Sequence, residues 1–501
     1  MRRRRATSSL SRGYSQRTVQ SGSRRSTRPT APMRPIMAVP GSANHPLVDG
    51  YENELLYRYE TSVKKAFDAI VSTLKKVSAY QHEEDFVARA QTEATQQLGF
   101  ELPNEILEDA WVDQLDMRSL FAWCVFKTYQ RFCDDFFGSA PLSHKGAEEF
   151  QNFLQQCGFH TMDVSPCADG RLAHAIRYVL RLPIEAVRRK SYAGAMFDID
   201  NSIQKWIETE MLRFREGRPN TADEPTRYLK AVAYHFSSVD PSHEGCAAHG
   251  SDDAKAAAEG LNRLLAFQQA IENSFCCGAS IDLLLLGIDT DTDAIKVHIP
   301  DANGDIDLDK FVDAKQVYQQ TQQLAAADAI QRVEQMIRDV QSGVGEGMLK
   351  LISQLLINNL SQIEYVDNYY GSHYEDIGHA ERFIGAGIGF EEVQLRNLTY
   401  FAYLNTVEES TADFDVGIKI FSKLNVAHGL PVPVVIRFDY HGQVPGARER
   451  AIEHCQRVSD AAKARYGHLA DKGLLHTLLV VRDCNANGQI EILGSSLKAA
   501  I

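Results

Sequence analysis

The chain has 501 residues, 44% of them hydrophobic, which is enough to fill the cores of roughly two to four soluble domains. Its formal net charge of −13 disfavours nucleic acid as a partner, because an acidic body repels phosphate. No apolar run approaches the roughly 18 residues that a membrane-spanning helix needs, so we do not expect an integral membrane protein.

Residues 1–45 are predicted to form a disordered, Arg-rich, partner-binding tail. The first 40 residues contain ten Arg and no Asp or Glu. A polar, like-charged segment cannot bury enough surface to offset its ordering entropy. Three functions compete for it: a nucleic-acid arm, a transit peptide, which is also Arg-rich and acid-free, or docking on an acidic protein surface.

Residues 46–143 are predicted to form an N-terminal helical domain. One apolar face recurs at steps of three and four residues, and an aromatic-rich run follows from Met117 to Phe137. The recurring residues are Leu56, Tyr59, Val63, Phe67, Ile70 and Leu74. Nothing in this region suggests catalysis, so we interpret it as a packing or assembly unit.

The segment 144–388 carries the most informative motif, Cys167-Ala168-Asp169-Gly170-Arg171. An apolar, β-branched stretch precedes it and Ser165-Pro166 interrupts that stretch, so Cys167 is expected on a loop at the carboxyl end of a strand. Open α/β sheets place their chemistry there. Arg171 can hold Asp169 ionised by a charge-assisted, bidentate hydrogen bond.

A later His and Cys would complete a zinc site with Cys167. Two sulfurs and one imidazole leave the fourth tetrahedral position open, which is the catalytic arrangement. Cys246 supplies the second sulfur, and His235 is the preferred imidazole because it directly follows the apolar run 229–234. His243 keeps a His-x-x-Cys spacing and stays an alternative, whereas His249 is expected to face solvent.

The rest of this segment alternates strand and helix, which predicts a mostly parallel sheet. A helix is expected over 252–275 and a central strand over 282–288. The acidic stretch 289–293 lacks EF-hand spacing and is interpreted as a turn. His379 and Glu381 could line the pocket or shuttle protons, but an ordinary helix-surface role explains them equally well, so they are left out of the predicted site.

An internal repeat links 229–299 with 432–493, each running strand, loop, long helix, strand, Asp-led turn and short strand. In this comparison Tyr440-His441 matches Tyr234-His235. No Cys follows His441 before the helix, and no Cys-x-Asp-x-Arg precedes it. Residues 389–501 are therefore predicted to be a degenerate copy of the catalytic domain without a metal site.

Nine cysteines, an odd number, argue against a disulfide framework and indicate a reduced intracellular protein. Two of them are assigned to zinc. The adjacent pair Cys276-Cys277 is assigned to core packing.

The Cys-x-Asp-x-Arg loop followed by a His and a Cys resembles the metal site of the β-class carbonic anhydrases. More narrowly, the chain is similar to the carboxysome shell branch of that class over nearly all 501 residues. The shared layout is an Arg-rich tail, a helical region, one complete site and a second half without a site. The resemblance implies an α/β fold with a mostly parallel sheet flanked by helices. It also implies duplication as a pseudo-dimer, because β-class enzymes build their sites at a dimer interface.

The activity that the resemblance implies is reversible hydration of carbon dioxide to bicarbonate with one Zn²⁺ per chain. Zinc lowers the pKa of bound water from about 15.7 towards roughly 7. Cys167, His235 and Cys246 would bind the metal. Asp169 would orient the nucleophile by accepting its hydrogen bond, and Arg171 would fix Asp169.

The resemblance also implies a place and partners. The place is the carboxysome lumen, at the inner face of the shell, in the bacterial cytoplasm. The partners are ribulose bisphosphate carboxylase, bound through the tail and supplied with CO2, the shell itself and further copies of this chain; neither nucleic acid nor membrane is expected.

Two alternative functions also assume a bound zinc ion. A catalytically silent scaffold joining the carboxylase to the shell would carry a structural zinc closed by a fourth ligand, for which His243 is the candidate. A zinc deaminase would need Pro-Cys-x-x-Cys, but Gly170 stands where the second Cys belongs after Pro166-Cys167.

Overall fold

The structure is a computed structural model that describes residues 43–110, 113–139, 141–142, 146–275, 279–402, 411–485 and 489–501. Contacts divide the chain into Met1–Met37 and Ala38–Ile501, and all described residues belong to the second unit. All but the last three residues of the predicted tail lie outside the described residues, as do Cys276 and Cys277.

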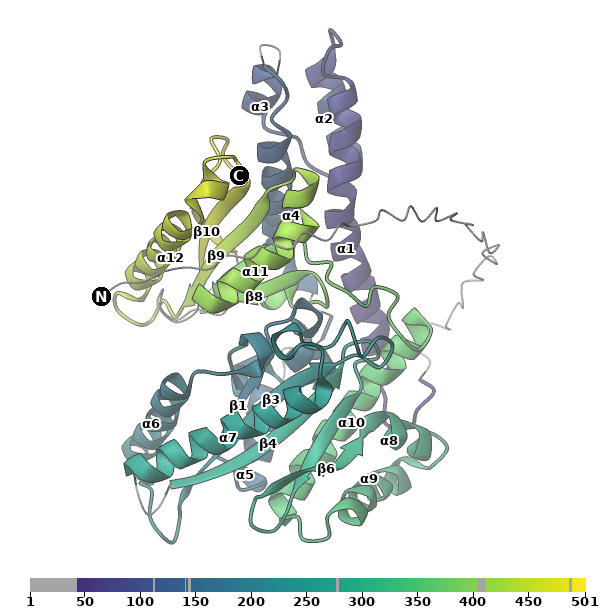
Figure 1. Ribbon diagram of the computed structural model, residues 1–501, viewed down its shortest axis with the longest axis vertical. Coiled ribbons are helices and arrows are strands. Elements are labelled where there is room, and N and C mark those ends of the chain that lie inside the picture. Colours follow the sequence, from purple (N-terminus) through teal and green to yellow (C-terminus); the bar gives the residue numbers. More distant parts are fainter. Residues whose placement is uncertain are drawn as a thin grey trace, which may run out of the picture. The chain divides into compact units, whose positions relative to one another are not determined.

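Four helices begin the described chain, where the sequence predicts a helical region: α1 (Gly50–Ala79), α2 (Phe86–Leu98), α3 (Asn104–Asp109) and α4 (Met117–Ser139) (Figure 1). Asp49 caps α1 by accepting hydrogen bonds from two N–H groups of its first turn. The apolar stripe of α1 is buried from Leu56 to Leu74 and packs on α2 and α4. Among the described residues, no helix combines the length and apolarity needed to cross a bilayer.

The first sheet has the order β2-β1-β3-β4-β5-β6. Its strands are β1 (Thr161–Pro166), β2 (Arg188–Arg189), β3 (Thr226–Phe236), β4 (Ala279–Asp289), β5 (Ile295–Pro300) and β6 (Ile306–Asp313). The first four pair in parallel, while β5 and β6 are antiparallel. Its helices are α5 (Ala147–Gln156), α6 (Ile199–Arg215), α7 (Asp253–Phe275), α8 (Ala314–Thr321), α9 (Ala326–Val340) and α10 (Glu346–Tyr370).

The second sheet has the order β11-β10-β9-β7-β8. Its strands are β7 (Phe383–Ile388), β8 (Thr399–Ala402), β9 (Val432–Tyr440), β10 (Leu475–Asp483) and β11 (Glu491–Ser495), with α11 (Thr411–Leu424) and α12 (Ala447–Ala470) between them. Only β11 is antiparallel to its neighbour. The prediction of an α/β protein with mostly parallel sheets flanked by helices is therefore confirmed (Figure 1).

The two sheets share one chain order. In each, a strand, its outer neighbour, a helix, a central strand, a second helix, a parallel strand and an antiparallel strand follow one another. The predicted division after residue 388 leaves β7 with the first segment, whereas β7 pairs with β8 and β9 in the second sheet. The pairing of β7 could not be predicted, because the sequence of a six-residue strand does not indicate which sheet the strand joins.

Equivalent hydrogen bonds within each sheet show which residues of the two sheets correspond. Thr290 N–H donates to Phe236 O at 2.9 Å in the first sheet, and Cys484 N–H donates to Tyr440 O at 2.7 Å in the second. The N–H of Ser238 likewise donates to the carboxylate of Asp289, as that of Gly442 does to Asp483. This register matches His441 with Ser237, so the predicted match of His441 with His235 is displaced by two residues.

The position that matches His235 is held by Asp439, which belongs to a buried cluster of charges. Arg437 donates to Glu392 at 2.9 and 3.1 Å and to Asp439 at 2.7 Å. Arg482 pairs with the same two carboxylates, and Tyr129 of α4 contacts Arg437 at 2.9 Å. The cluster thus ties the second sheet to the N-terminal helices, and each charge depends on the others because it is removed from water.

Replacement of Arg437 by Met should therefore lower the free energy of unfolding by about 3–5 kcal/mol, since Glu392 and Asp439 lose a buried counter-charge. Urea unfolding followed by circular dichroism measures this loss. Arg448→Ala is the matched control. Arg448 pairs with Glu491 on the exposed surface, so this substitution should leave stability unchanged. Equal midpoints for Arg437→Met and the parent would contradict the expectation.

Candidate metal centre

Cys167 follows β1 directly and begins the loop that carries the Cys-x-Asp-x-Arg motif. Its N–H donates to Ala233 O at 3.0 Å, and the N–H of Ala168 donates to Tyr192 O at 2.9 Å. The loop is therefore held to its neighbours for two residues beyond the strand, and the Cys167 side chain is buried. The predicted place of Cys167, on a loop at the carboxyl end of a strand, is the observed one.

His235 is the last residue but one of β3, the neighbour of β1 in the sheet. Its side chain is fully buried, and neither ring nitrogen has a hydrogen-bond partner among the described residues. A buried polar atom without a partner is costly, by about 1–3 kcal/mol. Coordination of a metal ion by the ring would remove that cost.

Cys246 is brought to the same point by a loop that two buried carboxylates hold in place. Asp291 accepts hydrogen bonds from the Ser237 hydroxyl at 2.6 Å and from Val239 N–H at 2.8 Å, and Asp289 binds Ser238. The acidic stretch 289–293 is thus the predicted turn, but its side chains point inward and anchor the loop.

The donor atoms of Cys167, His235 and Cys246 all lie within 4.8 Å of one another, and the two sulfurs are 4.0 Å apart. Hydrogen bonding to Cys246 raises the pKa of the Cys167 thiol well above 9.0, whereas the same bond lowers the pKa of Cys246. The two thiols therefore resist being ionised together while no cation is bound. A divalent cation stabilises both thiolates, so this donor set fits zinc.

Asp169 and Arg171 form the predicted bidentate pair. The Arg171 guanidinium donates from Nε to Oδ1 at 2.9 Å and from Nη2 to Oδ2 at 2.8 Å. Burial alone would raise the pKa of Asp169, but Arg171 and then His235 hold it well below its usual range. An ionised carboxylate oxygen thus lies 3.5 Å from Nε2 of His235, beside the three clustered donors.

Arg171 also joins three segments of the chain. Its Nη1 donates to the carbonyl of Glu244 at 2.7 Å, in the loop before Cys246, and to the carbonyl of Ile377 at 2.8 Å, between α10 and β7. The same side chain therefore fixes Asp169, the loop of Cys246 and the segment that leads into the second sheet.

The segment after Ile377 brings His379 and Glu381 to Asp169, and ligand atoms of these three residues lie within 4.8 Å of one another. Glu381 packs so closely on Gly170 that a Cβ at this position would collide with its carboxylate. The predicted site leaves both residues out, with a helix surface as one alternative and the pocket as the other; they lie on an irregular segment between α10 and β7. Roughly two hundred residues separate them from the motif, so no local pattern connects them.

The two alternative imidazoles lie elsewhere. The His243 side chain is 76% exposed and contacts Asp240 at 2.8 Å. His249 is buried, and its Nε2 contacts Gly194 O at 3.0 Å, so the prediction that it faces solvent is wrong. The reason is tertiary: the turn at 247–249 packs on the segment 193–195, which the sequence gives no means of pairing.

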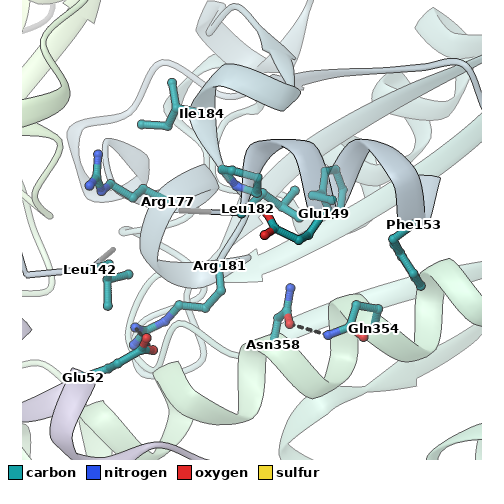
Figure 2. A pocket seen from close by; sticks show the side chains of 13 residues that line it. Glu52, Leu142, Glu149, Phe153, Arg177, Arg181, Leu182, Ile184, Gln354 and Asn358 are labelled. Carbon is teal, nitrogen blue, oxygen red and sulfur yellow. Dashed lines mark hydrogen bonds and ion pairs between the residues drawn. The ribbon is translucent and has the colours of Figure 1, made fainter. Parts of the chain in front are cut away.

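Polar and apolar side chains together line a cavity of about 420 Å³ (Figure 2). Arg177, Arg181, Glu52 and Glu149 line it, together with Gln354 and Asn358 of α10. Its cations and carboxylates balance, and none of the five predicted site residues is part of its lining. It is therefore not the metal centre.

Comparison with known proteins gives a single family for three consecutive parts of the chain. Three family models of the carboxysome shell carbonic anhydrase match this chain. The model of the N-terminal domain matches residues 45–137, that of the catalytic domain 149–379, and that of the C-terminal domain 380–497. The carboxysome shell carbonic anhydrase of Prochlorococcus marinus (strain MIT 9313) is 53% identical over 97% of this chain and 98% of its own length. That of Parasynechococcus marenigrum (strain WH8102) is 56% identical over 90% and 79%.

A more distant relative supports the same assignment. The carboxysome shell carbonic anhydrase of Halothiobacillus neapolitanus (strain ATCC 23641 / c2) is 45% identical over 91% of both chains. Identity at this level across nearly the whole length, with all three family models matching in order, shows that the chain belongs to the carboxysome shell carbonic anhydrase family.

Proposed function

We propose that Cys167, His235 and Cys246 hold one zinc ion per chain, and that this centre hydrates carbon dioxide reversibly to bicarbonate. The observation that carries the proposal is the buried imidazole of His235, whose two nitrogens lack hydrogen-bond partners among the described residues while it lies against two thiols. Two sulfurs and one imidazole with an ionised carboxylate beside them suit metal-assisted hydration.

As a member of its family, the chain is a carbonic anhydrase of the carboxysome, in the bacterial cytoplasm. We place it more narrowly in the lumen, at the inner face of the shell, where the CO2 that it releases feeds ribulose bisphosphate carboxylase. The Arg-rich tail is the segment proposed to dock on that carboxylase, because its ten Arg residues complement an acidic surface. We also propose association with further copies of the chain.

Zinc held by Cys167, His235 and Cys246 would lower the pKa of a bound water towards neutral pH and so make a nucleophile available. The residues of the chain orient and protect it. Asp169 is ionised and can only accept hydrogen bonds, so it favours the orientation in which the proton of the nucleophile points at the carboxylate and a lone pair points at CO2. Arg171 prevents the carboxylate from turning away, and the burial of all five residues limits access of bulk water.

The silent-scaffold alternative is less well supported. It requires a fourth protein ligand that closes the metal site, and His243 is the candidate. Its side chain is exposed and hydrogen-bonded to Asp240, while the cluster of mutually close donor atoms within the described residues has three members. An open fourth position is the arrangement expected of catalytic zinc.

We further propose that the two sheets arose by duplication, which makes one chain a pseudo-dimer with one working site. The shared chain order and register support this relation. Ile388 takes the position of Cys167, and Asp439 takes that of His235. The second half therefore lacks the sulfur and imidazole ligands, and its matching position is filled by the Arg437 charge cluster.

Zinc content should depend on His235 and not on His243. His235→Ala should lose most of its metal after gel filtration, because two thiols alone bind zinc weakly, whereas His243→Ala should retain one zinc per chain. Elemental analysis of the full-length chain measures both. A His243→Ala variant without metal, or a cobalt-substituted parent without exchangeable water, would support the closed structural site instead.

Asp169→Asn should keep its zinc and lose about 10²- to 10⁴-fold in kcat/KM for CO2 hydration, because the amide cannot replace the ionised acceptor. Stopped-flow assays with a pH indicator measure the rate. Asp305→Asn, in an exposed turn, is the matched control and should match the parent. A fully active Asp169→Asn enzyme would remove Asp169 from the mechanism.

Alanine substitution of Arg2 to Arg5, Arg24 and Arg25 should weaken binding to ribulose bisphosphate carboxylase and reduce its dependence on salt, because fewer charge contacts remain to be screened. Binding measured from low to physiological ionic strength tests this. Alanine at Ser21 and Ser23 is the control, since it leaves the charge unchanged. Undiminished affinity of the Arg variant at low salt would rule out docking through these residues.

A further inference from the structure

We propose that His379 transfers protons between the metal centre and solvent, and that Glu381 is the positioning residue that holds its ring. This inference rests on the proposed hydration of CO2. Each turnover converts CO2 and water into bicarbonate and one proton, so a proton must leave a centre whose five residues are all buried. His379 would receive that proton on a ring nitrogen and pass it to a buffer base in solution.

The location of His379 fits this task. It lies beside Asp169, with ligand atoms of His379, Glu381 and Asp169 within 4.8 Å of one another. Asp169 in turn lies 3.5 Å from Nε2 of the proposed metal ligand His235. His379 is therefore separated from the metal ligands by a single carboxylate.

Exposure distinguishes His379 from the other groups of the centre. Its side chain is 28% exposed, whereas each of the five site residues is exposed by 9% or less. A group that exchanges protons with buffer must reach water on one side and the reacting water on the other. His379 is partly exposed to water and lies beside Asp169, which is the position that such a group needs.

Glu381 sets the orientation of the ring. Its Oε1 lies 2.9 Å from Nδ1 of His379, so Nδ1 donates and Nε2 is left without a partner among the described residues. Glu381 is itself buried, and its second oxygen has no hydrogen-bond partner in the part of the chain that the structure describes. The absence of a side chain at Gly170 makes room for this carboxylate.

The surrounding charges favour a proton on the ring. Burial by itself lowers the pKa of His379, but Asp169 and the bond to Glu381 raise it to about 9, against the opposing charge of Arg171. The ring therefore holds a proton more firmly than an isolated imidazole does.

The decisive experiment compares full-length, zinc-loaded parent with His379→Ala at low buffer concentration. We expect kcat to fall at least about ten-fold while kcat/KM for CO2 is unchanged, because proton removal limits kcat and the hydration step alone limits kcat/KM. Added imidazole should restore kcat. In ¹⁸O exchange at equilibrium, release of labelled water should slow while interconversion of CO2 and bicarbonate keeps its rate. His243→Ala, which removes an exposed imidazole from the loop before Cys246, should match the parent.

A second measurement does not depend on activity. The pH titration of the His379 ring by NMR in the metal-free chain should show a pKa near 9 that falls towards 6.5 in Glu381→Gln. Unchanged kcat in His379→Ala would overturn the proposal. So would a parallel fall of kcat and kcat/KM without rescue by imidazole, since that pattern marks a structural role. An inactive zinc-loaded parent would instead overturn the proposed function itself, and with it this inference.

Discussion

The structure depends most on the guanidinium of Arg171. Four hydrogen bonds from this buried group reach both oxygens of Asp169, the carbonyl before Cys246 and the carbonyl of Ile377. Arginine suits this task because its planar group is always charged and presents several donors in fixed directions. The pair therefore stays charged without water, keeps Asp169 ionised and holds together segments separated by some two hundred residues. Without Arg171, the carboxylate and two main-chain carbonyls would be left buried and unsatisfied.

The second half of the chain contributes to the centre although it lacks the proposed metal ligands. Its leading segment supplies the carbonyl that binds Arg171 and brings His379 and Glu381 to Asp169. Ala168, inside the Cys-x-Asp-x-Arg loop, packs in the same apolar cluster as Tyr400 and Ile384 of the second sheet. At the matching place in the second half, Arg437, Glu392 and Asp439 form a buried ionic cluster that contacts α4. The first half thus has donors that suit a cation. In the second half, the charged side chains at the matching place neutralise one another.

Several features could be predicted from local sequence. The strand that ends before Cys167, the helix over 253–275, the buried strand over 279–289 and the helical N-terminal region all follow from apolar periodicity and turn residues. The Arg171–Asp169 pair also follows, because two residues of separation bring the side chains together. The register of the repeat predicted from the residues around His441 differs from the observed one by two residues, since similar residue types do not specify which main-chain groups pair. The burial of His249 was missed for a related reason, as its partner segment lies more than fifty residues away.

The sequence by itself determined the ligand types, the carboxylate–guanidinium pair and the order of strands and helices, because these depend on side-chain chemistry and on contacts between near neighbours. Only the tertiary structure decided that His235 rather than His243 joins the two cysteines, that β7 belongs to the second sheet, and that His379 and Glu381 reach the centre. These outcomes depend on which distant segments pack together. Such packing is set by the summed burial of apolar surface and by hydrogen bonding across the whole chain, which a local pattern of residues does not encode.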